Sequence, residues 1–142
     1  MALTYHPQPG EILLCNYSTG FVPPEMTKLR PVVIVSPRLR RRNDLVSVVP
    51  LSTTEPVPVE LHQCAIVLLT ALPAPYNSTK MWAKCDMIAT VALSRLDRFR
   101  AARKSGSSGR HYVSGQLDPS QMLLIRRAIL YSLGFALLTI HL

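Results

Sequence analysis

"KLRPVVIVSPRLRRR", residues 28 to 42, is a short apolar segment with arginines on both sides. Prolines bound residues 32–35, which are four consecutive β-branched residues. Such a run predicts a strand that is buried on both faces. A hydrophobic core explains the interior of this strand. It does not explain why Arg30 stands at one end and four more arginines, within residues 38–42, stand at the other.

The positive charge of the chain is concentrated in two segments. The net charge is +8, of which residues 38–44 carry +3 (four Arg and one Asp) and residues 95–110 carry +5 (five Arg, one Lys and one Asp). Clustered charge favours a polyanionic partner, because Lys and Arg release counterions from a phosphate backbone. A nucleic acid and an acidic protein both fit, and solvated loops that keep the protein soluble are the plain alternative.

The cysteines and the apolar segments indicate a cytoplasmic protein. Cys15, Cys64 and Cys85 are odd in number and lie beside strand-like sequence, which is typical of buried, reduced thiols. The first ten residues lack the pattern of a signal peptide, and no segment has the roughly eighteen apolar residues of a membrane span. His62 and Cys64 lack the paired spacing of a zinc site, so neither a metal nor a cofactor is predicted.

Most of the remaining chain reads as strands. Besides the opening segment, residues 11–17, 45–52, 62–69 and 81–91 are apolar or alternating runs separated by Pro, Gly, Ser and Thr. Strands at this spacing predict a small barrel or a strongly curved sheet. No linker or repeat divides the chain, so residues 1–142 are expected to form a single domain, mainly β with a C-terminal α-helix.

The C-terminal helix has clear start and stop signals. Asp118 is a good N-cap, Pro119 fits the first helical position and Gly134 is a plausible terminator. Residues 93–100 are expected to add one or two helical turns, and residues 104–110 a loop tip. Apolar residues recur at helical spacing and predict a helix face that packs in the core or against a second copy of the chain; they are Met122, Ile125, Ile129 and Leu133.

Two polar sites interrupt the apolar strands. Lys84 and Asp86 alternate within the run 81–91, so a continuous strand would point both to one face. A salt bridge on an exposed face is the structural alternative. Ser52 and Thr53 end another strand, where hydroxyl groups commonly satisfy the backbone of a turn.

These groups, with Arg30 and Glu25 beside the opening strand, fit cleavage of RNA without a metal. The reaction needs a base for the ribose 2′-hydroxyl, positive charge for the phosphorane and an acid for the departing 5′-oxygen. A surface ion pair between Arg30 and Glu25 is the plain alternative for these two residues. The candidate roles are base for Asp86 or Glu25, charge and acid for Arg30 and Lys84, and phosphate contacts for Ser52 and Thr53.

The order of several motifs resembles the PemK/MazF family of toxins from type II toxin–antitoxin systems. The matching stretches are "PGEILLCNY", "PEMTKLRPVVIVSPR", "VVPLSTT", "MWAKCDMIATVALSRLDRF" and the final helix ending "LGF". The resemblance implies an SH3-like barrel of the CcdB/PemK/MazF kind, usually a homodimer. It also implies an endoribonuclease that cleaves single-stranded RNA at short motifs, and an acidic antitoxin that covers the RNA groove.

Several site residues of the family map directly onto this chain. The arginine before the apolar strand is Arg30, and the acidic residue of the preceding loop is Glu25. The hydroxyl pair is Ser52 and Thr53. The resemblance also implies a basic loop that follows RNA or an antitoxin, formed by Arg38, Arg40, Arg41 and Arg42.

Other positions depart from the family pattern. Lys84 stands where the PemK-like motif has arginine, although Asp86 is kept, and lysine lacks the two-pronged grip of a guanidinium group. Ala89 also replaces a frequent arginine. Two alternatives therefore stay open: a catalytically weak or inactive binder of RNA or antitoxin, and a topoisomerase poison of the CcdB kind.

Overall fold

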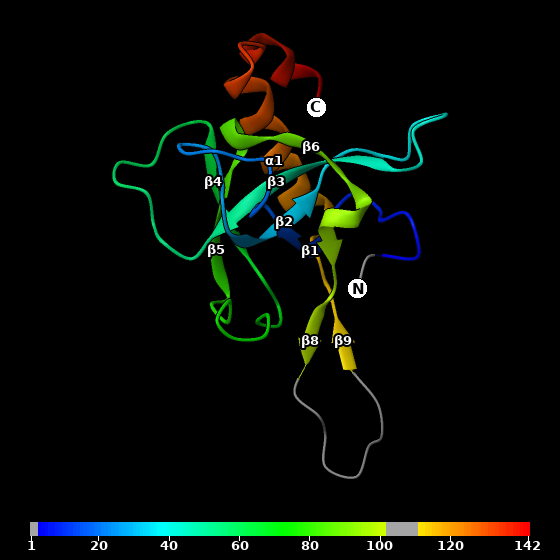
Figure 1. The fold of residues 1–142 in the computed structure, drawn as a ribbon. Coiled ribbons are helices and arrows are strands. Elements are labelled where there is room, and N and C mark those ends of the chain that lie inside the picture. Colours follow the sequence, from blue (N-terminus) through cyan, green and yellow to red (C-terminus); the bar gives the residue numbers. More distant parts are fainter. Residues whose placement is uncertain (1–2, 102–110) are drawn as a thin grey trace.

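The computed structural model describes residues 3–101 and 111–142. The fold is a mainly antiparallel β-structure with a C-terminal helix (Figure 1), as the sequence predicts. The strands are β1 (Glu11–Asn16), β2 (Leu29–Ile34), β3 (Leu45–Ser52), β4 (Gln63–Val67), β5 (Lys80–Lys84), β6 (Ala89–Ala92), β7 (Leu96–Asp97), β8 (Phe99–Ala101), β9 (His111–Val113) and β10 (Gly115–Gln116). The helices are the 3₁₀ turns η1 (Cys85–Met87), η2 (Leu93–Arg95) and η3 (Ala136–His141), and the α-helix α1 (Pro119–Ser132).

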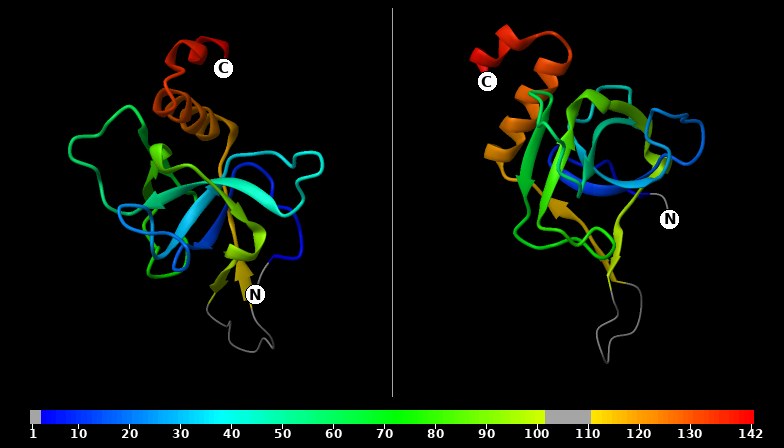
Figure 2. Two further views of the ribbon diagram at one scale, coloured as in Figure 1. Left: turned by 45° about the horizontal axis from the view of Figure 1, so that its top comes forward. Right: turned by 90° about the vertical axis from the view of Figure 1, so that its left-hand side faces the viewer.

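The main sheet is strongly curved. Its strand order is β10-β1-β2-β3-β5-β4, and β6 pairs with β3 while β7 pairs with β1. β6, η2 and β7 follow one another directly in the chain, yet β6 pairs with β3 and β7 pairs with β1. Since β3 and β1 lie on opposite sides of β2, the sheet must curl for one short segment to reach both (Figure 2). α1 lies against one side of this curl, beside β4.

The strand quoted at the outset has both faces buried, as predicted. Val33 belongs to a core cluster that includes Ile125 of α1. Val32 and Ile34 belong to a second cluster on the other face, together with Leu13. All three β2 residues are fully buried. The opening segment is thus the wall between two cores, which is why it carries no polar residue at these positions.

The predicted signals of the C-terminal helix are confirmed. Asp118 caps α1 by accepting a hydrogen bond from the Gln121 backbone N–H at 2.9 Å, and Gly134 has φ +82° just beyond the helix. That conformation suits glycine, which lacks a Cβ. Of the predicted face, Met122 and Ile125 are buried, whereas Leu133 is 54% exposed in this single chain, and Ala128 is buried as well. The chain leaves the helix at Leu133, so this side chain is not held on the helix face.

The predicted continuous strand over residues 81–91 was wrong. The 3₁₀ turn η1 separates β5 from β6, and both strands pair with β3. From the pair Leu51↔Ala83 to the pair Val48↔Ala89, β3 advances three residues and its partner six. The three extra residues form η1. Pro50 of β3 lies in this gap and has no N–H to donate, so a regular ladder cannot continue there.

Three further predictions can be compared with the structure. Of residues 93–100, only 93–95 form a helical turn, the 3₁₀ turn η2, whereas residues 96–97 and 99–100 belong to β7 and β8, which pair with β1 and β9. Residues 104–110 lie outside the described residues. The three cysteines are free, and burial raises the pKa of the Cys15 thiol to about 11, so it stays neutral.

No helix in the described ranges is both long and apolar enough to cross a membrane.

Candidate functional site

The strand register places four polar or aromatic side chains on one face of the sheet. Arg30 is in phase with Val32, which pairs with Pro50, and Ser52 is in phase with Pro50. Ser52 pairs with Trp82 on β5, and Lys84 is in phase with Trp82. Because residues two apart in a strand point to the same side, this face carries Arg30, Ser52, Trp82 and Lys84.

Arg30 sits at the start of β2, half-buried, and opposite Cys15 of β1. Its Nε atom is buried and has no hydrogen-bond partner among the described residues. Tyr17, two residues after Cys15, is also buried, and burial together with the Cys15 thiol raises the pKa of its phenol above the ordinary value. The ion pair of Arg30 with Glu25, which was the plain alternative for these two residues, is not found in the described part of the chain. The guanidinium group therefore retains hydrogen bonds to give.

The two hydroxyl residues at the end of β3, Ser52 and Thr53, differ in burial. Ser52 is 8% exposed, and its Oγ accepts a hydrogen bond from the Thr54 backbone N–H at 3.1 Å. This is the hydroxyl-to-backbone contact of a turn, the alternative to a phosphate-binding role for Ser52. The hydroxyl hydrogen of Ser52 remains free to point elsewhere, and Thr53 is exposed.

Glu25 and Asp86 meet at one pocket. This pocket has a volume of about 380 Å³ and lies between the β1–β2 loop and η1. Glu25 is held within its loop, because its backbone N–H donates to the Val22 carbonyl at 2.9 Å. The sequence places these two carboxylates sixty-one positions apart, so only the fold brings them together. The other lining residues are Tyr17, Phe21, Pro24, Met26, Met87, Ile88 and Ala89.

The loop that carries Glu25 is anchored by Arg95 of η2. The Arg95 Nη1 atom donates to the Asn16 carbonyl at 3.0 Å. Its guanidinium carbon lies 4.8 Å from the centre of the Phe21 ring, a cation–π contact. Phe21 in turn meets Tyr17 edge to face at 5.0 Å. One arginine of the second basic segment thus has a structural role at the site.

Asp86 has a neighbour that the sequence did not predict. η1 turns the chain between Lys84 and Asp86, and no ion pair joins these two residues in the described ranges. Instead Asp86 Oδ2 lies 3.8 Å from His62 Nε2. His62 precedes β4, and its carbonyl accepts the Cys85 backbone N–H at 3.0 Å. Only strand pairing shows this contact, because nothing in the spacing of the two residues predicts it.

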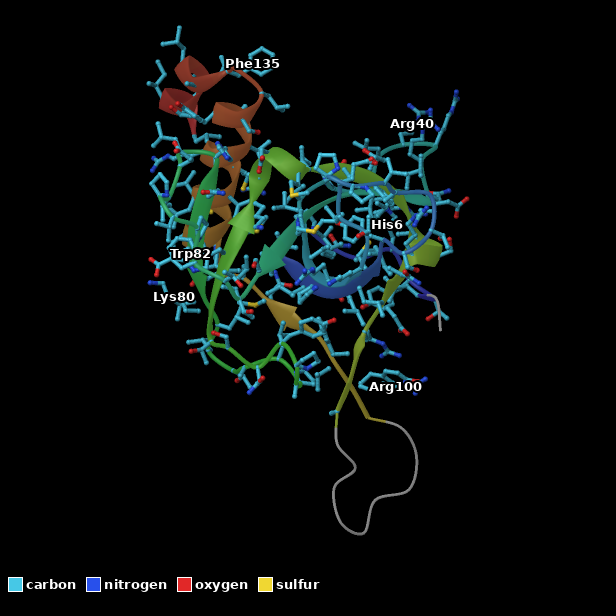
Figure 3. All side chains as sticks on the ribbon, turned by 60° about the vertical axis from the view of Figure 1, so that its left-hand side comes forward. His6, Arg40, Lys80, Trp82, Arg100 and Phe135 are labelled. Carbon is cyan, nitrogen blue, oxygen red and sulfur yellow. The ribbon has the colours of Figure 1, made fainter. Side chains whose placement is uncertain are left out.

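The basic loop lies away from these groups. Residues 38–42 connect β2 to β3 at the end of the sheet opposite Arg30 and Ser52. β2 alone, with six residues, separates the two ends by about 20 Å. Figure 3 shows Arg40 at this loop, far across the molecule from Trp82 and Lys80. The structure therefore does not bring the predicted basic loop to the same place as the predicted catalytic residues.

Two other features of the site bear on its chemistry. The Lys80 ammonium lies 5.1 Å from the centre of the Trp82 ring (Figure 3). Both residues are in phase with Lys84 along β5, so the three side chains share one face. Trp82 is buried and its ring is covered by the Lys80 cation, so the indole is not free to stack on an RNA base. Within the described ranges, no group of three His, Cys, Asp or Glu residues is arranged to hold a metal ion.

A curled antiparallel sheet with a C-terminal helix is also the fold of known toxins. A MazF structure from Deinococcus radiodurans has a TM-score of 0.61 at 15% identity, covering 92% of this chain and 98% of that one. Mycobacterium tuberculosis toxin MazF-mt6 has a TM-score of 0.58 at 19% identity, covering 87% and 95%. An endoribonuclease from a mycobacterial species has a TM-score of 0.56 at 22% identity, covering 91% and 92%. At these identities the likeness shows the fold.

Sequence comparison supplies the family. Residues 8–133 match the family described as PemK-like, MazF-like toxin of type II toxin-antitoxin system, and the chain belongs to this family. An uncharacterized Escherichia coli (strain K12) protein, YifN, is 30% identical over 153 residues, which covers 94% of this chain and 96% of the relative.

Proposed function

We propose that this protein is the toxin of a toxin–antitoxin pair and cleaves single-stranded RNA, including mRNA, without a metal ion. The 2′-hydroxyl attacks the adjacent phosphorus and leaves a 2′,3′-cyclic phosphate and a 5′-hydroxyl. One observation carries the proposal: Glu25 and Asp86 line one pocket, and η1, which carries Asp86, directly follows the strand that presents Lys84 on the same sheet face as Arg30. Family membership and the fold of known endoribonucleases support it.

The residues divide into the roles that the reaction needs. Glu25 or Asp86 takes the proton of the 2′-hydroxyl, since a carboxylate is a competent base when it is held near the hydroxyl. Arg30 and Lys84 stabilise the charge that builds on the phosphorane. Ser52 and Thr53 are proposed to contact phosphate oxygens at the end of β3.

The partners follow from the same proposal. The family implies an acidic antitoxin, and the net charge of +8 suits such a partner as well as it suits RNA. We propose that the loop containing Arg38, Arg40, Arg41 and Arg42 contacts a distal part of the RNA or the antitoxin. A homodimer and a cytoplasmic location remain part of this proposal.

The test is RNA cleavage in the presence of EDTA, with fragment ends mapped on a long unstructured RNA. We expect discrete cuts that leave 2′,3′-cyclic phosphates, lost in Arg30→Ala and Asp86→Asn. Asp44→Asn is the matched control, because Asp44 is an exposed carboxylate beside the basic loop. Intact RNA at high protein concentration would reject the enzyme.

The departure at two site positions favours a second candidate, a binder of RNA or antitoxin with little catalysis. Lys84 replaces the family's arginine, and Ala89 lines the pocket where arginine is frequent. This reading, or that of a topoisomerase poison, would gain if the protein bound RNA or inhibited DNA supercoiling while every phosphodiester stayed intact.

A further inference from the structure

The proposed site lacks a good proton donor for the departing 5′-oxygen. Ammonium and guanidinium groups remain protonated throughout the neutral range and give up a proton poorly, so Lys84 and Arg30 suit charge stabilisation better than acid catalysis. An efficient acid changes its protonation near the working pH. Among side chains, imidazole has this property.

His62 is placed to fill this role. Its Nε2 atom lies 3.8 Å from Asp86 Oδ2, and its side chain is 30% exposed, so substrate and solvent can reach it. The hydrogen bond from the Cys85 N–H to the His62 carbonyl fixes its backbone against η1. The charged neighbours of this segment are Asp86, Lys84, which lies opposite Gln63, and Glu60, whose backbone N–H donates to the Gln63 side chain.

We propose that His62 is the general acid of RNA cleavage and that Asp86 positions its imidazole. The inference rests on the proposed endoribonuclease activity and adds a residue to it. As the bond from O2′ to phosphorus forms and the bond from phosphorus to O5′ breaks, the His62 imidazolium gives its proton to O5′. The 2′-hydroxyl proton goes to a base on the other side of the phosphorus.

The same geometry assigns the base. In-line displacement keeps the attacking and departing oxygens on opposite sides of the phosphorus. Asp86 and His62 are too close together, at 3.8 Å, to serve these two sides separately. Glu25 reaches the pocket from the β1–β2 loop, whereas Asp86 reaches it from η1. Glu25 is therefore the general base, and Asp86 positions the general acid His62.

A substrate that needs no acid tests this assignment. A single RNA linkage is synthesised with sulfur in place of the bridging 5′-oxygen, because a thiolate leaves without protonation. On the ordinary linkage we expect His62→Gln to lower kcat/KM by about 10²–10³-fold. On the sulfur linkage that loss should shrink to less than about tenfold for His62→Gln and Asp86→Asn, while Glu25→Gln stays impaired. His141→Gln, an exposed histidine in η3, is the matched control.

The outcomes separate this inference from the proposed function. Wild-type protein that leaves both linkages intact would overturn both proposals. Wild-type cleavage with His62→Gln at full rate, or equally impaired on both linkages, would overturn the acid role alone.

Discussion

Truncation of Ile125 tests how α1 supports the site. Ile125 is fully buried, and its carbonyl lies 3.8 Å from the Cys85 Sγ, so its backbone contacts η1 directly. Ile125→Ala removes three buried carbon atoms, worth about 0.8 kcal/mol each, and leaves a cavity that adds to the loss. We expect the free energy of unfolding to fall by about 3–4 kcal/mol.

This loss converts to a shift in melting temperature. An unfolding entropy of about 2.1 cal/mol/K per residue gives about 0.3 kcal/mol/K for the whole chain, so the midpoint should fall by about 10–13 °C. Urea unfolding followed by circular dichroism measures the free energy, with the slope m unchanged. Leu124→Ala is the control, because Leu124 is 44% exposed and should cost less than about 1 kcal/mol. Equal small effects of both variants would refute the burial of the Ile125 side chain in the core between α1 and the sheet.

Three further predictions concern the site and its supports. Lys84→Arg should raise kcat/KM for RNA by up to about tenfold, since guanidinium grips a phosphate with two hydrogen bonds, and a lower rate would show that lysine is preferred here. Arg95→Ala should speed hydrogen exchange in the β1–β2 loop and lower the free energy of unfolding by about 1 kcal/mol, because the contacts to the Asn16 carbonyl and the Phe21 ring are lost. Unchanged exchange would contradict the anchoring role of Arg95. Hydrogen bonds from Ser120 and a backbone N–H lower the pKa of Asp118 in the folded protein. The Asp118 carboxylate therefore stabilises the fold at pH values above its pKa in the unfolded chain, and this contribution is lost as the pH falls through its lower pKa in the folded protein. Urea unfolding should therefore show Asp118→Asn weakening the protein near pH 7 but little near pH 2, and a difference that persists in acid would reject the charged cap.

The sequence predicted regular elements well where the signal is local. Prolines and β-branched residues marked β2, and Asp118, Pro119 and Gly134 marked the ends of α1. The break of the run 81–91 could not be predicted in this way, because its own alternation fits a single strand. The break depends on Pro50, some thirty residues earlier, and becomes visible only when β3 is paired.

The candidate site divides along the same line. The resemblance implied Arg30, Glu25, Lys84 and Asp86 as site residues, and the fold brings Glu25 and Asp86 to one pocket. The sequence gives no sign of the contact between His62 and Asp86, because the two residues are twenty-four positions apart and no helical or strand period joins them. Pairing of β4 with β5 decides that contact.

By itself the sequence determined the residue types, the opening strand and the C-terminal helix, because side-chain period, proline and caps act within a few residues of chain. Tertiary structure decided where the charges stand relative to one another. Arg30 comes to the face with Ser52 and Lys84, whereas the arginines of residues 38–42 are carried to the opposite end of β2. The physical reason is that strand direction and register, set by hydrogen bonds between distant segments, determine which ends of the strands meet.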